Sequence, residues 1–207
     1  MKNSYFDGGL LQLVGYRILG AFVTVITLGI CLPWAYTMIY SWEAKHTVIN
    51  GKRLHFDGTA IELFGQWIKW LLLTIITLGI YGFWVGIKLT QWRAKHTHTE
   101  NGGESYFDGT LGQLVGYSIL AFLITLCTVG ICLPWAFTML YNWEIKHLIY
   151  DGQRVTFDGT AVQLFGNWIK WFLLTIITIG IYGFWLDIKL RQWKVSHMNF
   201  LENAAHN

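Results

Sequence analysis

Glutamate and histidine lie three residues apart at two related places in the chain, a spacing that metal-binding helical bundles use. The two pairs are Glu43 with His46 and Glu144 with His147. Di-metal carboxylate bundles take two such pairs and add one Glu from each of two further helices. That set is incomplete here, because Glu62 has Gln163 as its counterpart in the second half of the chain. We therefore interpret the pairs as solvated helix ends and expect no metal and no cofactor.

Histidine recurs at one position in each of four repeated stretches. These residues are His46, His96, His147 and His197. In a fourfold arrangement they could form a ring of groups that titrate near neutral pH, and we keep them as candidate binding residues. The interpretation that we favour is a hydrogen bond at the end of a helix or a hairpin. The sequence contains no recognisable nucleophile with a base, phosphate loop or complete metal set, so we do not expect an enzyme.

Glycine lies near the centre of four similar phrases, of which TIITLGIYGFW at residues 74–84 is one. The glycines are Gly29, Gly79, Gly130 and Gly180. We expect one helix to end and another to begin at each of them, which would free backbone carbonyl groups at membrane depth. Lys88 and Lys189 lie about one turn into the second helix. These glycines and lysines are therefore candidate residues of a pathway or binding site.

Charged residues are few, and four long stretches contain none. They make up 13% of the 207 residues, against roughly a quarter in a soluble domain. The uncharged stretches lie between Arg17 and Glu43, Lys69 and Lys88, Asp108 and Glu144, and Lys170 and Asp187. Runs of about 18 or more apolar residues are typical of membrane spans. The composition thus predicts a polytopic membrane protein with lipids as partners. A net charge of +3 without a basic run argues against nucleic acid.

The chain repeats itself four times. Each repeat begins with Phe-Asp-Gly and closes on one of the four histidines, and its first residue is Phe6, Phe56, Phe107 or Phe157. Alternate repeats resemble each other more than neighbours do, which indicates a duplication of a duplication. We therefore divide the chain into two halves, residues 1–103 and 104–207, with repeats at 5–54, 55–103, 104–155 and 156–200.

Two helices are expected in each repeat. Capping boxes mark the start of the first helix at Thr59 with Glu62, Thr110 with Gln113 and Thr160 with Gln163. This helix should extend about 18 residues, to Thr27, Thr77, Thr128 or Thr178. Pro33 and Pro134 suit the start of the second helix, which should have roughly 14 residues.

Tryptophan and a second set of glycines have expected places in a membrane. We expect interfacial aromatic residues at Trp34, Trp84, Trp135 and Trp185 and at Trp42, Trp92, Trp143 and Trp193. Close contacts between helices are expected at Gly15, Gly65, Gly116 and Gly166.

The segments between repeats resemble β-hairpins. Asn50-Gly51 and Asp151-Gly152 are the residue pairs that two-residue hairpin turns require, and Asn101-Gly102-Gly103 lies at the equivalent place in the middle linker. Residues 3–6 and 197–200 could pair as a further hairpin. Lys and Arg occur in every linker, so we place all linkers and both termini on the cytoplasmic side. The predicted fold is an all-α integral membrane protein of four helix-break-helix repeats with short β-hairpins between them.

A known family shows the same motifs. Phe-Asp-Gly-Thr, Leu-Phe-Gly, LLLTIITLGIYGFW and IKL-x-QW are present in the second repeat. With them the chain resembles the YjgN-like family of uncharacterised bacterial inner-membrane proteins (domain of unknown function 898). The second and fourth repeats fit best, whereas the first and third have Cys-Leu-Pro in place of Tyr-Gly-Phe. The resemblance implies a polytopic protein of the bacterial inner membrane with no assigned activity.

Two functions are compatible with this organisation. Repeats around an axis and helices broken at membrane depth are typical of channels and transporters, so we expect passage of a small solute or ion. The alternative is a non-catalytic membrane scaffold or envelope-organising protein that binds lipid or a partner protein. In either case we expect a possible homo-oligomer, and a possible protein partner would bind through the cytoplasmic hairpins.

Overall fold

The structure is a computed structural model that describes residues 3–100 and 102–201. The described residues contain eight helices, in which 17-residue and 14-residue helices alternate. The longer ones are α1 (Leu10–Ile26), α3 (Ala60–Ile76), α5 (Leu111–Cys127) and α7 (Ala161–Ile177). The shorter ones are α2 (Leu32–Lys45), α4 (Gly82–Lys95), α6 (Leu133–Lys146) and α8 (Gly183–Ser196). Each repeat therefore folds as one helical hairpin, and we call the repeats the first to fourth units.

The helices begin where their capping residues predict. In α3 the Thr59 side chain accepts from the Glu62 backbone N–H, and the Glu62 carboxylate accepts from the Thr59 N–H at 3.1 Å. Equivalent reciprocal bonds start α5 and α7, so all three expected capping boxes are confirmed. Pro33 and Pro134 lie in the first turns of α2 and α6, also as expected.

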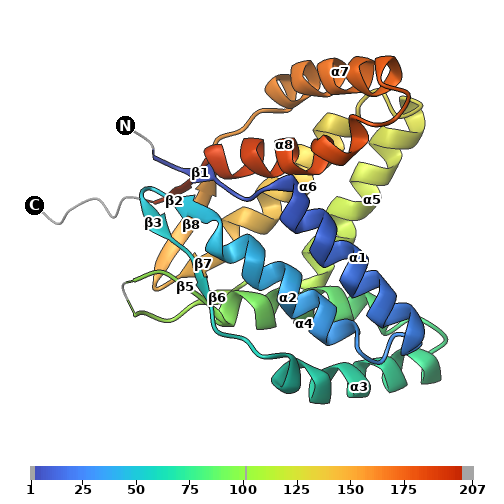
Figure 1. Cartoon of the computed structure of the whole chain (residues 1–207), viewed down its shortest axis with the longest axis vertical. Coiled ribbons are helices and arrows are strands. Elements are labelled where there is room, and N and C mark those ends of the chain that lie inside the picture. Colours follow the sequence, from blue (N-terminus) through green and yellow to red (C-terminus); the bar gives the residue numbers. More distant parts are fainter. Residues whose placement is uncertain (1–2, 101, 202–207) are drawn as a thin grey trace, which may run out of the picture.

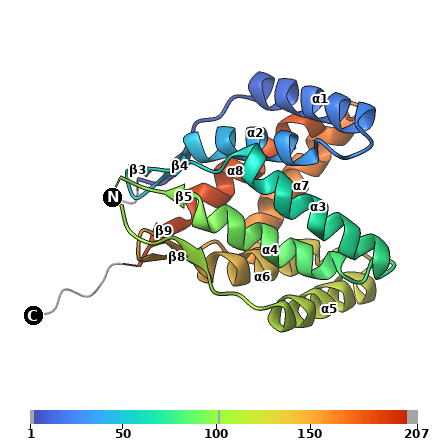
Figure 2. The ribbon, with the colours of Figure 1, turned by 90° about the horizontal axis from the view of Figure 1, so that it is seen from below.

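Nine short strands lie at the end of the molecule opposite the helix turns (Figures 1 and 2). They are β1 (Tyr5–Phe6), β2 (Thr47–Ile49), β3 (Lys52–Arg53), β4 (His55–Phe56), β5 (Thr97–His98), β6 (Tyr106–Phe107), β7 (Leu148–Tyr150), β8 (Gln153–Phe157) and β9 (Met198–Phe200). The expected hairpins are present at Asn50-Gly51, which joins β2 to β3, and at Asp151-Gly152, which joins β7 to β8. Both turns have positive φ at each of their two residues, as a type I′ turn requires.

The remaining strand pairs close each unit on itself. The strand before Phe-Asp-Gly pairs with the strand after the terminal histidine of the same unit, in the antiparallel pairs β1–β2, β4–β5, β6–β7 and β8–β9. Two predicted hairpins are therefore wrong. The strands of the middle linker, β5 and β6, pair with β4 and β7 and not with each other, and Asn101 lies outside the described residues. Likewise β1 and β9 pair with β2 and β8.

A cluster of Phe, Trp and His explains why Phe-Asp-Gly and His recur together. In the first unit the Phe6 and Trp42 rings meet edge to face at 5.6 Å between centroids, and Trp42 lies against His46. The other units repeat this cluster with Phe56, Trp92 and His96; Phe107, Trp143 and His147; and Phe157, Trp193 and His197. A Cβ on Gly8 would lie 2.5 Å from the Phe6 ring, so only glycine fits there. These four Trp are buried core residues, and the prediction that they are interfacial is wrong.

The units are arranged in a ring. Successive helices contact one another from α1 to α7, and α8 contacts α1, so the chain winds once around a central axis. The shorter helices lie towards the axis and the longer ones on the outside (Figures 1 and 2). The main hydrophobic core contains residues from both halves of the chain, among them Ile49, Leu54, Leu148 and Val155.

The prediction of an all-α integral membrane protein is wrong. Across residues 3–100 and 102–201, none of the helices combines the length and the hydropathy that a membrane crossing requires. The longer helices have 17 residues and are about 25 Å long, short of a hydrocarbon core of about 30 Å. The uncharged stretches reach the length of a span because each includes the end of one helix, a turn and the start of the next. Each apolar run is therefore folded back on itself.

Candidate functional site

The four candidate glycines lie in the turns between paired helices. Their φ angles are between +83° and +93°, and each helix ends in a Schellman motif. In the first unit the Gly29 N–H donates to the Thr24 carbonyl at 2.8 Å and the Leu28 N–H donates to the Val25 carbonyl at 3.2 Å. The Thr27 and Gly29 carbonyls accept from Ile30 and Leu32. Carbonyls that the sequence suggested would be free are thus bonded within the turn.

The residue before each glycine has an unusual conformation. These residues are Leu28, Leu78, Val129 and Ile179, and their φ angles are between +50° and +52°. A left-handed conformation costs a residue with a branched side chain roughly 1–2 kcal/mol, and Gly or Asn ordinarily occupies this position. All four side chains are 91–93% exposed, so packing against the protein does not compensate this cost. Strain kept at a functional position is a recognised reason for such outliers.

The apolar surface extends from these turns onto the adjoining helices. We call the four residues and their glycines the apolar end of the molecule. Large apolar side chains beside it are also exposed, namely Val25, Ile26, Ile30, Ile75, Ile76, Ile80, Leu126, Ile131, Ile176, Ile177 and Ile181. The tryptophans Trp34, Trp84, Trp135 and Trp185 are partly exposed in the same region, in the first turns of the shorter helices. So many exposed apolar side chains at one end of a molecule indicate an interaction surface.

The candidate lysines lie on the shorter helices of the second and fourth units. Lys88 lines a groove between α3 and α4 together with Lys69 and Lys95. Lys189 is exposed and donates to the Gln192 side chain at 3.4 Å. The structure thus separates the candidate lysines from the candidate glycines along the helices.

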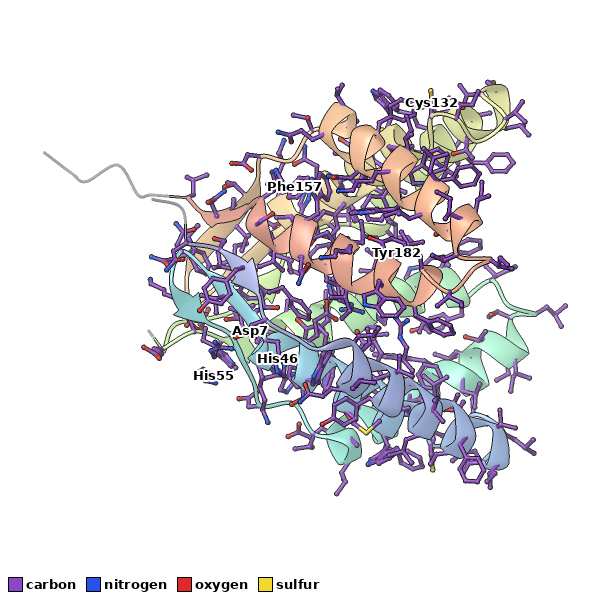
Figure 3. All side chains as sticks on the ribbon, turned by 45° about the horizontal axis from the view of Figure 1, so that its top comes forward. Asp7, His46, His55, Cys132, Phe157 and Tyr182 are labelled. Carbon is purple, nitrogen blue, oxygen red and sulfur yellow. The ribbon has the colours of Figure 1, made fainter. Side chains whose placement is uncertain are left out.

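The candidate histidines do not form a ring of free imidazoles. In each unit Nδ1 donates to the backbone carbonyl of the buried Trp four residues earlier, at 2.7–2.8 Å, in His46, His96, His147 and His197. The His46 carbonyl also accepts from the Asp7 N–H at 3.1 Å, and Asp7 and His46 lie together beside the strands in Figure 3. Cys132, next to the third turn, lies at the other end. The helix-end hydrogen bond that we favoured is therefore confirmed.

The Glu-x-x-His pairs do not gather into a metal site. Glu43 pairs with Arg191, and Glu144 pairs with Arg93 at 2.6 Å, while the histidines make the backbone bonds described above. Among the described residues, His, Cys, Asp and Glu form no group of three or more that could hold a metal ion.

Sequence reasoning missed a ring of alternating charge around the central axis. The residue after the last Trp of each unit is Glu43, Arg93, Glu144 or Lys194, and these four residues form what we call the charge ring. Arg93 of α4 lies over the Tyr40 ring of α2 at 5.0 Å, and Lys194 of α8 lies over the Tyr141 ring of α6 at 4.3 Å. With the two ion pairs, these contacts join all four shorter helices. The sequence does show charges of alternating sign at these equivalent positions. That the four side chains lie near one another could not be inferred from it, because this depends on how the four helices pack.

A small cavity lies beside the charge ring. Its volume is about 120 Å³, and its lining includes all four members of the ring together with Tyr40, Tyr141 and Tyr150. Burial lowers the pKa of Lys194, and the carboxylates of Glu144 and Glu43 offset this only in part. Burial raises the pKa of Tyr141 well above its usual value, so this phenol stays protonated at neutral pH. The cavity can hold a few water molecules or one very small polar molecule.

A Ser, a His and an Asp also meet where the middle linker contacts the second hairpin turn. His98 Nδ1 lies 3.2 Å from Asp151 Oδ1, and Ser105 Oγ lies 3.3 Å from the same His98 nitrogen. A catalytic triad needs a histidine that bridges serine and aspartate through its two different nitrogens. Here one nitrogen faces both, so the arrangement lacks that geometry. Asp151 instead accepts from the Thr99 N–H at 2.7 Å and fastens the linker to the turn.

Two stretches of the chain match a family described as a bacterial protein of unknown function (DUF898). The matches cover residues 51–106 and 152–205, which together are just over half of the chain. They coincide with the second and fourth units, which are also the units in which the sequence motifs fit best. No curated protein and no solved structure matches the chain.

Proposed function

This chain belongs to the DUF898 family of bacterial proteins of unknown function, as its sequence predicted, and from that premise we propose that it binds a lipid surface through its apolar end. The four turns would enter one face of a bilayer, and the strands would remain outside it. Of the two functions expected from the sequence, this corresponds to the non-catalytic scaffold that binds lipid.

One observation carries the proposal. Each unit holds an aliphatic residue in a strained left-handed conformation with its side chain 91–93% exposed. In water this position combines a backbone cost with an apolar surface that contacts nothing. In lipid each side chain would gain about 1.5–3 kcal/mol on leaving water, enough to offset the backbone cost. The four turns lie at the same end of the molecule, so they can enter one surface together (Figures 1 and 2).

A fluorescence measurement tests the proposal. In a chain with Cys31, Cys127 and Cys132 replaced by Ser, Leu78→Cys is labelled with a polarity-sensitive dye and mixed with neutral phospholipid vesicles. We expect a blue shift of the emission. The control is Ile61→Cys on the same helix, because Ile61 is 87% exposed but lies at the strand end of α3. No shift at residue 78, or an equal shift at both positions, would refute the proposal.

Passage of a solute or ion, the other expected function, stays a prediction. Leakage of ions and small solutes from the same vesicles tests it. The expected homo-oligomer, the partner bound through the hairpins and a location at the bacterial inner membrane also stay predictions. Both termini, placed on the cytoplasmic side by the sequence, lie outside the described residues.

A further inference from the structure

The second unit contains a basic groove between its two helices. The groove has a volume of about 510 Å³, and its lining includes Lys69 and Trp70 from α3 and Lys88, Trp92 and Lys95 from α4. Both helices therefore contribute lysine to the groove, and each also contributes one buried tryptophan. Glu62, at the edge of the groove, is engaged by the Thr59 N–H in the capping box and lies 3.7 Å from His96 Nε2.

The size of one side chain distinguishes the second and fourth units, which have Trp70 and Trp171, from the first and third units. In the first unit the residue equivalent to Trp70 is Gly20, and a Cβ there would lie 3.0 Å from the Cβ of Ala35. The third unit has Ala121 at this position, and α1 and α5 pack closely on α2 and α6. In the second unit the Trp70 side chain is buried beside α4 and holds the two helices apart.

The lysines of the groove make no close contact with an acidic side chain, although Glu62 and Lys95 interact electrostatically. Within residues 3–100 and 102–201, none of the three makes an ion pair or a hydrogen bond with another side chain. The first and third units have uncharged residues at the positions of Lys69 and Lys88, namely Leu19, Met38, Leu120 and Met139. The fourth unit has Ser196 in place of Lys95. Three lysines against one carboxylate, Glu62, leave the groove positively charged, and a bound anion would balance that charge.

The position of the groove along the helices fits a membrane interface. Lys69 lies seven residues before the end of α3 at Ile76, and Lys88 lies six residues after the start of α4 at Gly82. At 1.5 Å per residue both lie about 10 Å from the helix ends, with the turn beyond. One leaflet of hydrocarbon is about 15 Å thick. Insertion of the apolar end would therefore bring these ammonium groups close to the phosphate level.

We propose that the groove binds the phosphodiester headgroup of an anionic phospholipid. The lysines would contact the phosphate oxygens. This inference rests on the proposed function, because it requires the apolar end to be in lipid.

Vesicle binding of matched variants tests the inference. The groove variant is Lys69→Gln with Lys88→Gln, and the control is Lys45→Gln with Lys146→Gln. The control residues occupy the position of Lys95 in the first and third units, where helices pack closely, and the change in net charge is the same. On vesicles with about a third phosphatidylglycerol we expect the groove variant to bind roughly 25-fold more weakly than the unmodified protein, about fivefold per lysine. The control should lose less than about threefold.

The outcomes separate the two proposals. Equal binding of the unmodified protein to neutral and anionic vesicles would overturn this inference and leave the proposed function standing. An equal loss in both double variants would also overturn it, because the effect would then be general surface charge. No binding to either vesicle would overturn both proposals. Displacement from anionic vesicles by glycerol 3-phosphate at constant ionic strength would assign the groove to a soluble phosphate ester and overturn the lipid assignment.

Discussion

The four strained turn residues allow a substitution with opposite effects on folding and on lipid binding. Asparagine adopts the left-handed conformation readily, whereas Leu, Val and Ile adopt it only at a cost in free energy. The variant replaces all four with Asn: Leu28→Asn, Leu78→Asn, Val129→Asn and Ile179→Asn. Because these side chains are 91–93% exposed, their removal costs no packing. Relief of strain should therefore raise the free energy of unfolding by about 0.5–1 kcal/mol per site.

Lipid binding should change in the other direction. Transfer of one exposed aliphatic side chain from water to lipid is worth about 2 kcal/mol, which corresponds to roughly 30-fold in the partition coefficient. A single Leu78→Asn variant should then bind neutral vesicles about 30-fold more weakly. The fourfold variant should show no measurable binding.

Two assays on the same protein check this prediction. Urea denaturation followed by circular dichroism gives the stability, and flotation with neutral vesicles gives the partition coefficient. The control replaces Leu11 and Ile61 with Asn, since both side chains are 87% exposed but lie at the strand end of their helices. Binding that survives the fourfold change, or an equal loss in the control, would refute the reasoning. A loss of stability in the fourfold variant would refute the strain argument by itself.

Three further predictions concern the fold around the site. Asp151→Asn should cost about 2 kcal/mol at pH 7, since the buried carboxylate accepts from Thr99. Burial acts to raise the pKa of Asp151, but these hydrogen bonds outweigh it and the pKa is below 3.8. The stabilisation by the Asp151 carboxylate is therefore complete above pH 3.8 and is lost as the pH falls through the lower pKa of the folded protein. Denaturation curves of the variant and the unmodified protein should then converge in strong acid. Arg93→Met should lower the free energy of unfolding by about 2 kcal/mol, because it leaves the Glu144 carboxylate without its partner. The loss is smaller than for a fully buried pair, since the Glu144 side chain is 32% exposed. Adding Glu144→Gln should restore part of it in the same assay. Gly58→Ala should lower the melting temperature, because its Cβ would lie 2.5 Å from the Phe56 ring, whereas Gly65→Ala, with open space in the middle of α3, should raise it slightly.

Local features of the fold could be predicted from the sequence. The capping boxes, the helix ends at Thr27 and its equivalents, and the Asn50-Gly51 turn depend on residues close together in the chain, and the structure confirms them. The fold class could not be predicted in the same way. The break at Gly79 was predicted, but the high hydropathy of residues 70–87 over the length of a span does not show that the helices on either side of it fail to cross a membrane.

Contacts between residues far apart in the chain could not be predicted from the sequence either. The pairing of β1 with β2 joins residues about forty positions apart, and no turn sequence near residues 3–6 indicates it. Gly15 and its equivalents were expected at close helix contacts, yet nothing lies within 4 Å of a Cβ placed there. The close contact is at Gly20, because the face that α1 presents to α2 is set by the ring of units.

The closure of each unit on itself determines where the apolar end must lie. The Asp7 N–H donates to the His46 carbonyl, and equivalent bonds join Asp57 to His96, Asp108 to His147 and Asp158 to His197, so every unit starts and finishes at the same place. The charge ring lies near that place too, at the strand ends of the shorter helices. Both helices of a unit therefore extend away from the closure, and the turn between them is at the far end. Four such units around one axis bring four apolar turns to one end of the molecule.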